Sequence, residues 1–322
     1  MTTLNTRSIS NLLGLSPIRA ARVALIFPYQ IAGTMDLSFV ILIEMLYAVA
    51  SLVLISAGLA VVFGMMKVIN LAHGEFMMMG GYATITAVSL GVNVFVAMLV
   101  IAPLVVGLIG LIVERLVIRH LYGRLVDTML ATWGLSLVFI GLATMIFGNT
   151  TTGISTPIPG FAVGGYQING YNFFIIIVSI VLVIAMYAVL RGTRAGLIAR
   201  GTMQRSDMAA ALGYSPDRIY MMTFFCGSAL SGLAGAVLAP LVGLVPTSGG
   251  AYIAKAFITV IAGGPSLIAG LVSSATSFGL VSQIFTFAIS PVIGEVALLI
   301  AAVILLRMMP QGITGRFFKG KM

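Results

Sequence analysis

The sequence predicts an all-α fold, a polytopic bundle of transmembrane helices. Of its 322 residues, 60% are hydrophobic and 8% are charged, whereas soluble proteins carry about 25% charged residues. Apolar runs of about 20 residues recur along the whole chain, and each is long enough to cross a ~30 Å hydrocarbon core as a helix. The alternating strands of about 10 residues that are typical of a membrane barrel do not occur. A chain with this much apolar surface requires lipid as its solvent.

The apolar runs predict about eight spans plus one or two broken or re-entrant segments. Residues 245–265, "VPTSGGAYIAKAFITVIAGGP", are rich in glycine, and their apolar part is too short for a full crossing, so they predict a half-helix or a re-entrant element. Residues 1–35 are expected to form an N-terminal extension, in which 23–33 are either an extra crossing or a surface helix. Residues 36–315 form the expected transmembrane domain, and 316–322 a basic tail. The spans are expected at about 39–64, 75–90, 94–118, 128–148, 172–190, 219–244, 266–288 and 291–307.

The basic residues gather in short segments between the apolar runs, which predicts the orientation of the chain. The net charge of +9 could indicate nucleic acid, but the retention of positive residues on the cytoplasmic side of a membrane explains the clusters more simply. No nucleic-acid partner is therefore expected. The loop 149–171 carries no charge and is expected to be periplasmic. The segments expected in the cytoplasm contain Arg115, Arg119 and Arg124; Arg191, Arg194, Arg200, Arg205 and Arg218; and Arg307, Arg316, Lys319 and Lys321.

Residue types that build metal or catalytic sites are scarce. Cys226 is the single cysteine and lies inside an apolar run, and the two histidines are far apart, so we expect no disulfide within the chain and no metal cluster. The nucleotide-binding pattern G-x-x-x-x-G-K-[ST] is absent from the sequence. We therefore expect no cofactor and no enzyme activity in this chain.

One apolar run carries small residues at helical spacing. Gly227, Ser231 and Gly235 recur every four residues, and Ser228 and Gly232 form a parallel row. Small residues at this spacing allow two helix backbones to approach closely inside a membrane. Helix packing is favoured over a pore-lining role for these residues.

The segment 191–218 is the most highly charged loop of the chain, with five arginines and two aspartates. A short helical stretch, 206–212, lies within it. Ser206 or Asp207 could cap its start, Gly213 could end it, and Pro216 follows soon after. A helix of about two turns cannot cross the membrane and is not stable alone. It is either an exposed element that the groove of a partner receives or a simple connector.

A resemblance to a known family favours the first of these alternatives. The run Ala209–Gly213, followed by Pro216-Asp-Arg218, resembles the coupling-loop signature of permease subunits from bacterial ABC importers. Further blocks in the same order resemble the branched-chain amino acid permease family, and together they cover roughly residues 40–315. The blocks are "GLAVVFGMMKVINLAHGEFMMMGGYA" (58–83), "LATWGLSL" (130–137), "FFCGSALSGLAGAVLAP" (224–240), "VIAGGPSLIAGLV" (260–272) and "MPQGITG" (309–315).

The resemblance implies the partners and the coupling residues. In that family, two homologous permease subunits pair with two ABC ATPase subunits and a periplasmic substrate-binding protein. ATP-driven closure of the ATPases would push on the short helix and switch the bundle between outward-open and inward-open states. Asp207 stands where such loops often carry a glutamate. The residues that the resemblance assigns to ATPase coupling are Arg205, Asp207, Ala209, Ala210, Leu212 and Gly213.

The stretch "VINLAHGEFMMMGGY" (68–82) places rare polar residues between two long apolar runs. On a continuous helix, Asn70 and His73 share one face and Glu75 points nearly opposite, so His73 and Glu75 pair only if the backbone breaks, for example at Gly74. The four residues are either a polar hinge on the solute pathway or hydrogen-bonding partners of neighbouring helices near the membrane boundary. Lys255 either anchors a carboxylate or lines the exit of the pathway, or it is a lysine that extends to the interface.

These observations predict a multi-pass permease of the bacterial inner membrane, surrounded by lipid. The expected function is import of branched-chain or other hydrophobic amino acids, driven by separate ATPase subunits. A urea or short-chain amide permease of the same family is the first alternative. A secondary transporter or channel that works without ATPases is the second, although the sequence offers no coupling-ion constellation and no filter motif.

Overall fold

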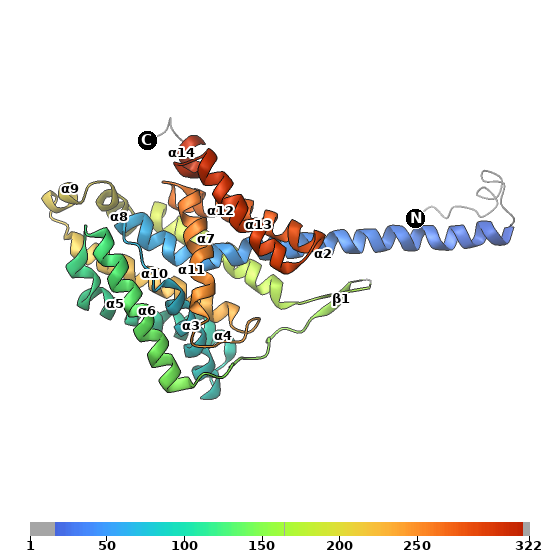
Figure 1. The fold of residues 1–322 in the computed structure, drawn as a ribbon, viewed down its shortest axis with the longest axis horizontal. Helices are drawn as coiled ribbons and strands as arrows, with labels where there is room; N and C mark the ends of the chain where they lie inside the picture. Colours follow the sequence, from blue (N-terminus) through green and yellow to red (C-terminus); the bar gives the residue numbers. More distant parts are fainter. Residues whose placement is uncertain (1–16, 164, 318–322) are drawn as a thin grey trace.

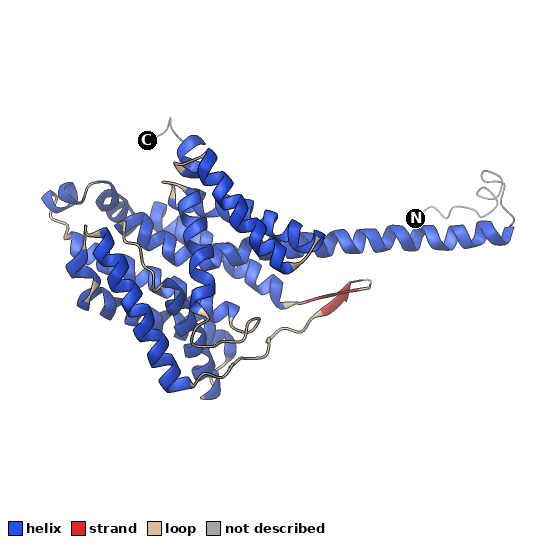
Figure 2. Cartoon of the chain, in the orientation of Figure 1, coloured by secondary structure: helices blue, strands red, loops and turns tan. Residues whose placement is uncertain are grey.

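The computed structural model describes residues 17–163 and 165–317, and this part of the chain is helical apart from one short hairpin (Figures 1 and 2). The elements are α2 (Pro17–Met66), α3 (His73–Ser89), α4 (Val94–Val96), the π-helical η1 (Ala97–Ile101), α5 (Ala102–Leu116), the 3₁₀ turn η2 (Ile118–Leu121), α6 (Leu125–Phe147), β1 (Phe161–Val163), β2 (Tyr166–Ile168), α7 (Tyr171–Gly192), α8 (Arg194–Gln204), α9 (Ser206–Ala211), α10 (Pro216–Leu238), α11 (Gly249–Gly263), α12 (Leu267–Ala288), α13 (Pro291–Met308) and α14 (Gly312–Phe317).

The structure confirms a helical, polytopic membrane protein and adjusts the number of spans. Among the described residues, seven helices are long and apolar enough to cross a membrane. The predicted span at 75–90 is α3, which has only 17 residues. The glycine-rich segment at 245–265 contains α11, an apolar helix of 15 residues, in agreement with the predicted half-helix. Helices α3 and α11 are thus shorter than the seven helices that could span the membrane.

A small β-hairpin departs from the all-α prediction. Strands β1 and β2 pair antiparallel within the loop 149–171, with Phe161 opposite Ile168 and Val163 opposite Tyr166. The sequence "FAVGGYQI" carried the signal, because two short segments with strand-forming residues, separated by Gly-Gly, are typical of a hairpin.

The first helix is much longer than the span predicted at 39–64. Helix α2 has 50 residues, about 75 Å, and its N-terminal part extends away from the bundle (Figure 1). Residues 23–33 therefore lie within one continuous helix with the first candidate span, Leu37–Met66. Of the predicted extension 1–35, residues 1–16 lie outside the described residues, as do residues 318–322 of the predicted tail.

Helix α10 lies at the centre of the bundle, packed against α2, α3 and α5. In the most apolar part of α10, 61% of the residues are buried. In the span Pro291–Gly315, which contains α13, the corresponding share is 17%. The small residues make this packing possible. A Cβ atom on Gly58 of α2 would collide with Ser231 and with the carbonyl oxygen of Gly227, and one on Gly235 would collide with the carbonyl oxygen of Met77 in α3.

The second row of small residues contacts other neighbours of α10. Ser228 lies against Gly110 of α5, and Gly232 contacts Val106 of α5 and Gly80 of α3. The two parallel rows thus place one helix against three others, because backbones approach closely only where side chains are absent or small.

The C-terminal segment packs on the turn between α11 and α12. The Thr314 hydroxyl donates a hydrogen bond to the carbonyl oxygen of Gly263 (2.6 Å) and accepts one from the Ser266 amide (3.3 Å). Gly264 and Gly312 both have positive φ and approach so closely that neither has room for a side chain. Two sequence blocks about 50 residues apart, "VIAGGPSLIAGLV" and "MPQGITG", therefore form one contact.

Candidate functional site

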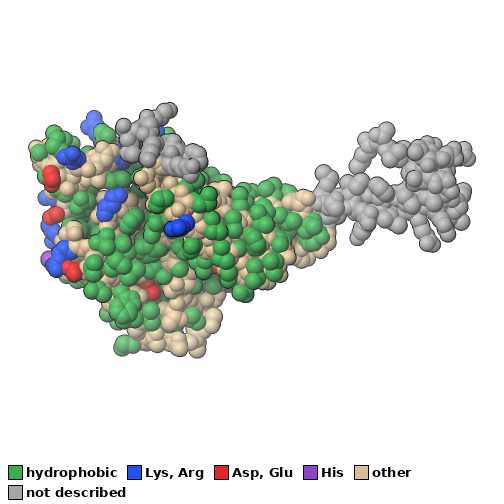
Figure 3. All heavy atoms as spheres, turned by 45° about the horizontal axis from the view of Figure 1, so that its top comes forward, with side chains coloured by type: hydrophobic (Ala, Val, Ile, Leu, Met, Phe, Trp, Pro, Cys, Tyr) green, Lys and Arg blue, Asp and Glu red, His purple; other side chains and the backbone are tan. Residues whose placement is uncertain are grey.

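Most of the charged side chains visible in Figure 3 lie at the end of the bundle that carries α8 and α9. At this end Arg119 donates to the Asp217 carboxylate (2.8 Å), and Arg124 pairs with Asp127 (2.5 Å). The hydrogen bond to Asp217, together with the charge of that carboxylate, raises the pKa of Arg119. The loops predicted to be cytoplasmic thus meet at one end of the molecule.

A buried acid is held at the same end. The Tyr122 hydroxyl, on the turn after η2, donates to the carboxylate of Glu114, which is almost fully buried in α5. Burial is the main cause that raises the pKa of Tyr122, and the hydrogen bond to Glu114 adds to it. The phenol therefore keeps its proton at neutral pH and remains a donor to Glu114.

The predicted coupling loop contains two helices, α8 and α9, where the sequence analysis predicted one. Helix α9 begins at Ser206, but its N-cap is Arg205, and neither Ser206 nor Asp207 caps it with a side chain, contrary to the prediction. Its end is as predicted: Gly213 has φ +87°, its amide donates to Ala210, and the Tyr214 amide donates to Ala209. This pair of hydrogen bonds is a Schellman motif, which requires the left-handed conformation that glycine adopts easily.

The tip of the predicted coupling loop exposes apolar side chains beside arginines. Leu212 is 75% exposed and Met208 is 59% exposed, although large apolar side chains outside a membrane normally find cover. Ala209 is buried and holds α9 against the rest of the chain. The other residues predicted to couple to the ATPase are all exposed: Arg205, Asp207, Ala210, Leu212 and Gly213. Met208 belongs to the same surface and was not among the predicted residues.

His73 lies deep in the bundle and hydrogen-bonds to two helices. Its Nε2 is 2.8 Å from the carbonyl oxygen of Ile55 in α2, and its Nδ1 is 3.1 Å from the Ser231 hydroxyl of α10. Because a carbonyl oxygen only accepts, Nε2 carries the proton and Nδ1 accepts, so a neutral imidazole uses both nitrogens. Ile55 is 11 residues before the end of α2, so His73 lies about 16 Å inside the bundle.

The backbone breaks earlier than the sequence analysis assumed. No continuous helix runs through residues 70–77: α2 ends at Met66, where Lys67 takes a left-handed φ of 57°, and α3 begins at His73. The Asn70 side chain accepts from the Ala72 amide (3.0 Å) and shapes the turn before α3. The backbone is therefore not broken at Gly74. This residue is helical, and its missing side chain leaves room for the backbone of Gly249.

Glu75 and His73 have separate partners, as their predicted divergence implies. The Ser136 hydroxyl of α6 hydrogen-bonds to the Glu75 carboxylate, and the other carboxylate oxygen is buried without a partner among the described residues. Asn70, His73, Gly74 and Glu75 are all buried within this chain. None of the four reaches the surface of the chain, so the structure favours their role as hydrogen-bonding and packing residues.

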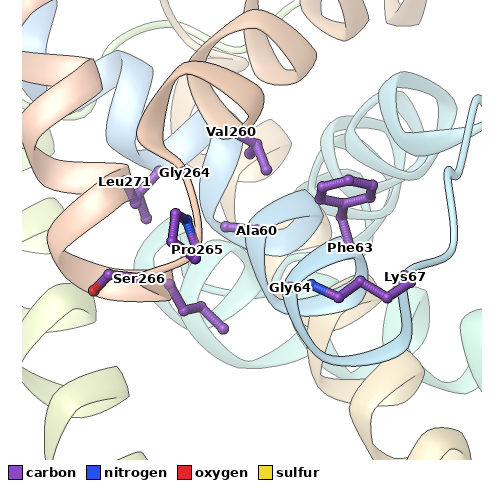
Figure 4. Close-up of a pocket in the computed structure, with 10 residues that line it drawn as sticks. Ala60, Phe63, Gly64, Lys67, Val260, Gly264, Pro265, Ser266 and Leu271 are labelled. Atoms are coloured by element: carbon purple, nitrogen blue, oxygen red, sulfur yellow. The ribbon is translucent and has the colours of Figure 1, made fainter. Parts of the chain in front are cut away.

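The loop after α2 meets the turn before α12 at a small cavity of about 40 Å³ (Figure 4). Phe63, Gly64 and Lys67 line one side of it, and Gly264 and Pro265 line the other. This places the end of α11 at the same end of the bundle as the end of α2. Helix α11 therefore runs from the level of Gly74 toward the basic end.

Lys255 differs from the four residues around His73 because it lies on the outer surface of the chain. Its Nζ is 2.6 Å from a carboxylate oxygen of Glu295 in α13, and the two side chains are 29% and 53% exposed. The sequence analysis singled out Lys255 but did not identify Glu295 as its partner. The sequence did contain a signal for this ion pair, because these two residues are charges of opposite sign within two neighbouring apolar helices.

Comparison with known proteins places the chain in a family. The family described as "Branched-chain amino acid transport system / permease component" matches residues 41–309. The chain belongs to this permease family. Its members are the permease components of transport systems. This chain therefore serves in the passage of solute and is not itself catalytic. The prediction of the family from the sequence blocks is confirmed.

Several curated relatives are similar to this chain over most of its length. The chain is 27% identical over 282 residues to a probable branched-chain amino acid transport permease protein, LivH, of Methanocaldococcus jannaschii. The match covers 82% of this chain and 88% of the relative. The chain is also 27% identical to the high-affinity branched-chain amino acid transport permease proteins LivH of Escherichia coli strain K12 and BraD of Pseudomonas aeruginosa, with 82% of this chain and 91% of each relative covered. Among solved structures, PsaBC from Streptococcus pneumoniae in complex with Fab aligns with a TM-score of 0.47 and 15% identity, over 87% of this chain and 94% of that chain.

Proposed function

We propose that this permease is the membrane subunit of an ATP-driven importer that carries branched-chain or similar hydrophobic amino acids across the bacterial inner membrane. The observation that carries the proposal is the exposed tip of the coupling loop, where Met208 and Leu212 project from the basic end of a chain in this family. The relatives named above are transport permeases for branched-chain amino acids, which supports the same substrate class here.

The proposed assembly contains a second homologous permease, two ABC ATPases and a periplasmic binding protein. The concentration of arginines at one end supports a cytoplasmic position for the loop 191–218 and for the C-terminus. The uncharged loop 149–171, with its hairpin, is then periplasmic, where the binding protein delivers the solute.

Movement of the ATPases would reach the bundle through α10. Helix α9 is joined to α10 by residues 212–215, and α10 contacts α2, α3 and α5 through its two rows of small residues. Closely packed backbones move as rigid bodies, because such interfaces have no room for gradual deformation. A push on α9 would therefore displace α10 together with its neighbours.

The docking assignment is tested by replacing Leu212 with glutamate and isolating the permease with its ATPases. Because the Leu212 side chain is largely exposed, we expect Leu212→Glu to be inserted at the normal level and to lose ATPase association. Leu125→Glu is the matched control, an exposed leucine at the same end but outside α9. If the ATPases remain bound to Leu212→Glu, α9 is not the docking element.

Substrate class is tested on the complete importer. Uptake of leucine, isoleucine or valine by proteoliposomes that contain both permeases, the ATPases and the cognate binding protein is the expected result. Uptake of urea or a short amide in place of these amino acids would establish the alternative. Uptake without the ATPases would place the chain among secondary transporters or channels.

A further inference from the structure

The Lys255–Glu295 ion pair joins two apolar helices, α11 and α13, on the outer surface of this chain. Lys255 precedes the end of α11 by eight residues, about 12 Å, and Glu295 precedes the end of α13 by 13 residues, about 20 Å. Both helices end near the basic end of the bundle. Both residues therefore lie within the length of their helices, Lys255 six residues after the start of α11 and Glu295 four residues, about 6 Å, after the start of α13.

Lipid hydrocarbon cannot solvate this ion pair. Charged side chains within spans face a bundle interior or a water-filled cavity, because hydrocarbon cannot solvate them. The groove between α7 and α10 provides the contrast, since its volume of about 1220 Å³ is lined almost entirely by apolar side chains such as Ile177, Val181 and Met222. That groove suits lipid. On the face formed by α11 and α13, the other exposed side chains of α13, such as Val296 and Ile300, are apolar as well, and the ion pair is the group that requires water or protein beside it.

The surface beside Lys255 is formed by residues with very small side chains. Gly250, Ala251 and Ala254 are exposed on the first turns of α11, and none has a side chain beyond Cβ. A Cβ atom added to Gly250 would meet no other atom within 4 Å. The ion pair therefore stands beside a stretch of exposed small residues that leaves its near side uncovered in this chain.

We propose that Lys255 and Glu295 form a transient binding site for a zwitterionic amino acid, on a solute pathway that this face and the second permease enclose together. The solute carboxylate binds the Lys255 ammonium, and the solute ammonium binds the Glu295 carboxylate. The inference rests on the proposed function and adds the residues that recognise the solute.

The chemistry of the pair suits a zwitterion. Two opposite charges about 3 Å apart on the protein meet two opposite charges on the solute, so one ion pair is exchanged for two and no net charge enters the membrane. The hydrophobic side chain of the solute would lie over the small residues of α11. A solute without charges, such as urea, gains nothing from this exchange.

The first arm of the test measures leucine uptake by the complete importer with Lys255→Met, Glu295→Gln and the double variant. Loss of a charged hydrogen-bonding partner should lower uptake at least about tenfold in each, while permease abundance and ATPase association stay unchanged. The control is the exposed pair at the basic end, altered as Arg124→Gln/Asp127→Asn, for which uptake should stay within about twofold. A double variant that carries leucine as fast as the unaltered importer overturns the proposal, because the pair is then only structural.

The second arm keeps the ion pair intact and measures water access. With Cys226 replaced by alanine, Ala254→Cys should react with a charged methanethiosulfonate reagent, and leucine should slow the reaction. Val181→Cys, in the apolar groove, should not react. An unreactive Ala254→Cys means that the face is dry and overturns the proposal even where the ion-pair variants fail to insert.

The two arms also separate this inference from the proposed function. If the unaltered importer carries leucine and the variants carry it equally fast, the binding site is wrong and the function stands. If the unaltered importer carries no leucine, the proposed substrate is wrong, and the labelling of Ala254→Cys still decides whether the face of α11 borders water.

Discussion

The two short helices, α3 and α11, begin side by side in the middle of the bundle and have opposite surroundings. Their first turns touch at Gly74 and Gly249, and from there they run to opposite ends. Tyr82 of α3 stacks on Phe147 at the far end of α6, whereas α11 ends beside the C-terminal segment. Eleven of the 17 residues of α3 are buried, against five of the 15 residues of α11.

The polar residues of the two helices follow this difference. His73 on α3 finds both hydrogen-bonding partners within the chain, so that helix is complete as part of the scaffold. Lys255 on α11 has one partner and an open side. A helix that is enclosed by its own chain can hold the bundle together but cannot touch a passing solute. The open helix is the one that needs a partner subunit or a solute to complete it.

The contact between the two helices should be the most sensitive point. Gly249→Ala places a methyl group within 3 Å of the backbone of Gly74 and Glu75. Backbone atoms cannot relieve this clash by a rotamer change, as a flexible side chain could. We expect the free energy of unfolding to fall by about 3 kcal/mol, measured by thermal or denaturant unfolding of the purified permease. Gly250→Ala, one residue along, is the control and should be neutral or slightly stabilising, because alanine favours helix. Equal effects of the two changes would mean that the close approach is not real.

The enclosed histidine should give the next largest effect. His73→Leu removes the side-chain donor to the Ile55 carbonyl oxygen and the link to Ser231, at a cost of about 2 kcal/mol. The Ser231 hydroxyl then keeps only the Gly227 carbonyl oxygen as a partner. Because the role of His73 is to hold α2, α3 and α10 together, uptake and membrane abundance should fall in parallel. A variant with normal abundance that fails to transport would place His73 on the solute pathway instead.

A smaller change is expected at the buried acid of α3. Glu75→Gln keeps an acceptor for the Ser136 hydroxyl but adds amide hydrogens where no acceptor is available, so we expect a loss of about 1 kcal/mol. Uptake per inserted molecule should be unchanged, as measured by uptake normalised to permease abundance. A selective loss of uptake would show that the enclosed helix does take part in transport.

The open helix should show almost no change in stability and a large change in transport. Ala254 is exposed, so Ala254→Trp should alter the free energy of unfolding by less than about 0.5 kcal/mol. The indole would occupy the space beside Lys255, and leucine uptake should drop sharply while the ATPases remain bound. Normal uptake by this variant would show that the pathway lies elsewhere and would remove the functional difference between the two helices.

Local patterns in the sequence determined the class of the protein, most of its spans and the short helix within the loop 191–218. Hydropathy and the placement of arginines act within about 20 residues, so a single chain displays them directly. The glycine that ends α9 could likewise be predicted, because the Schellman motif is a local structure. The family blocks at 58–83 and 260–272 were visible for the same reason.

Only the tertiary structure decided what those residues contact. The Lys255–Glu295 pair joins two helices across 40 residues, and the contact of Gly74 with Gly249 spans 175. A charge in an apolar run is costly wherever it stands, but its partner depends on how the helices pack. The break at Lys67 was hidden as well, because the hydrogen bonds of Leu71 and His73 to α6, α2 and α10 hold the chain out of helix there. Local hydrophobicity specifies which segments enter the membrane, and packing between distant segments decides which polar groups are enclosed and which remain open.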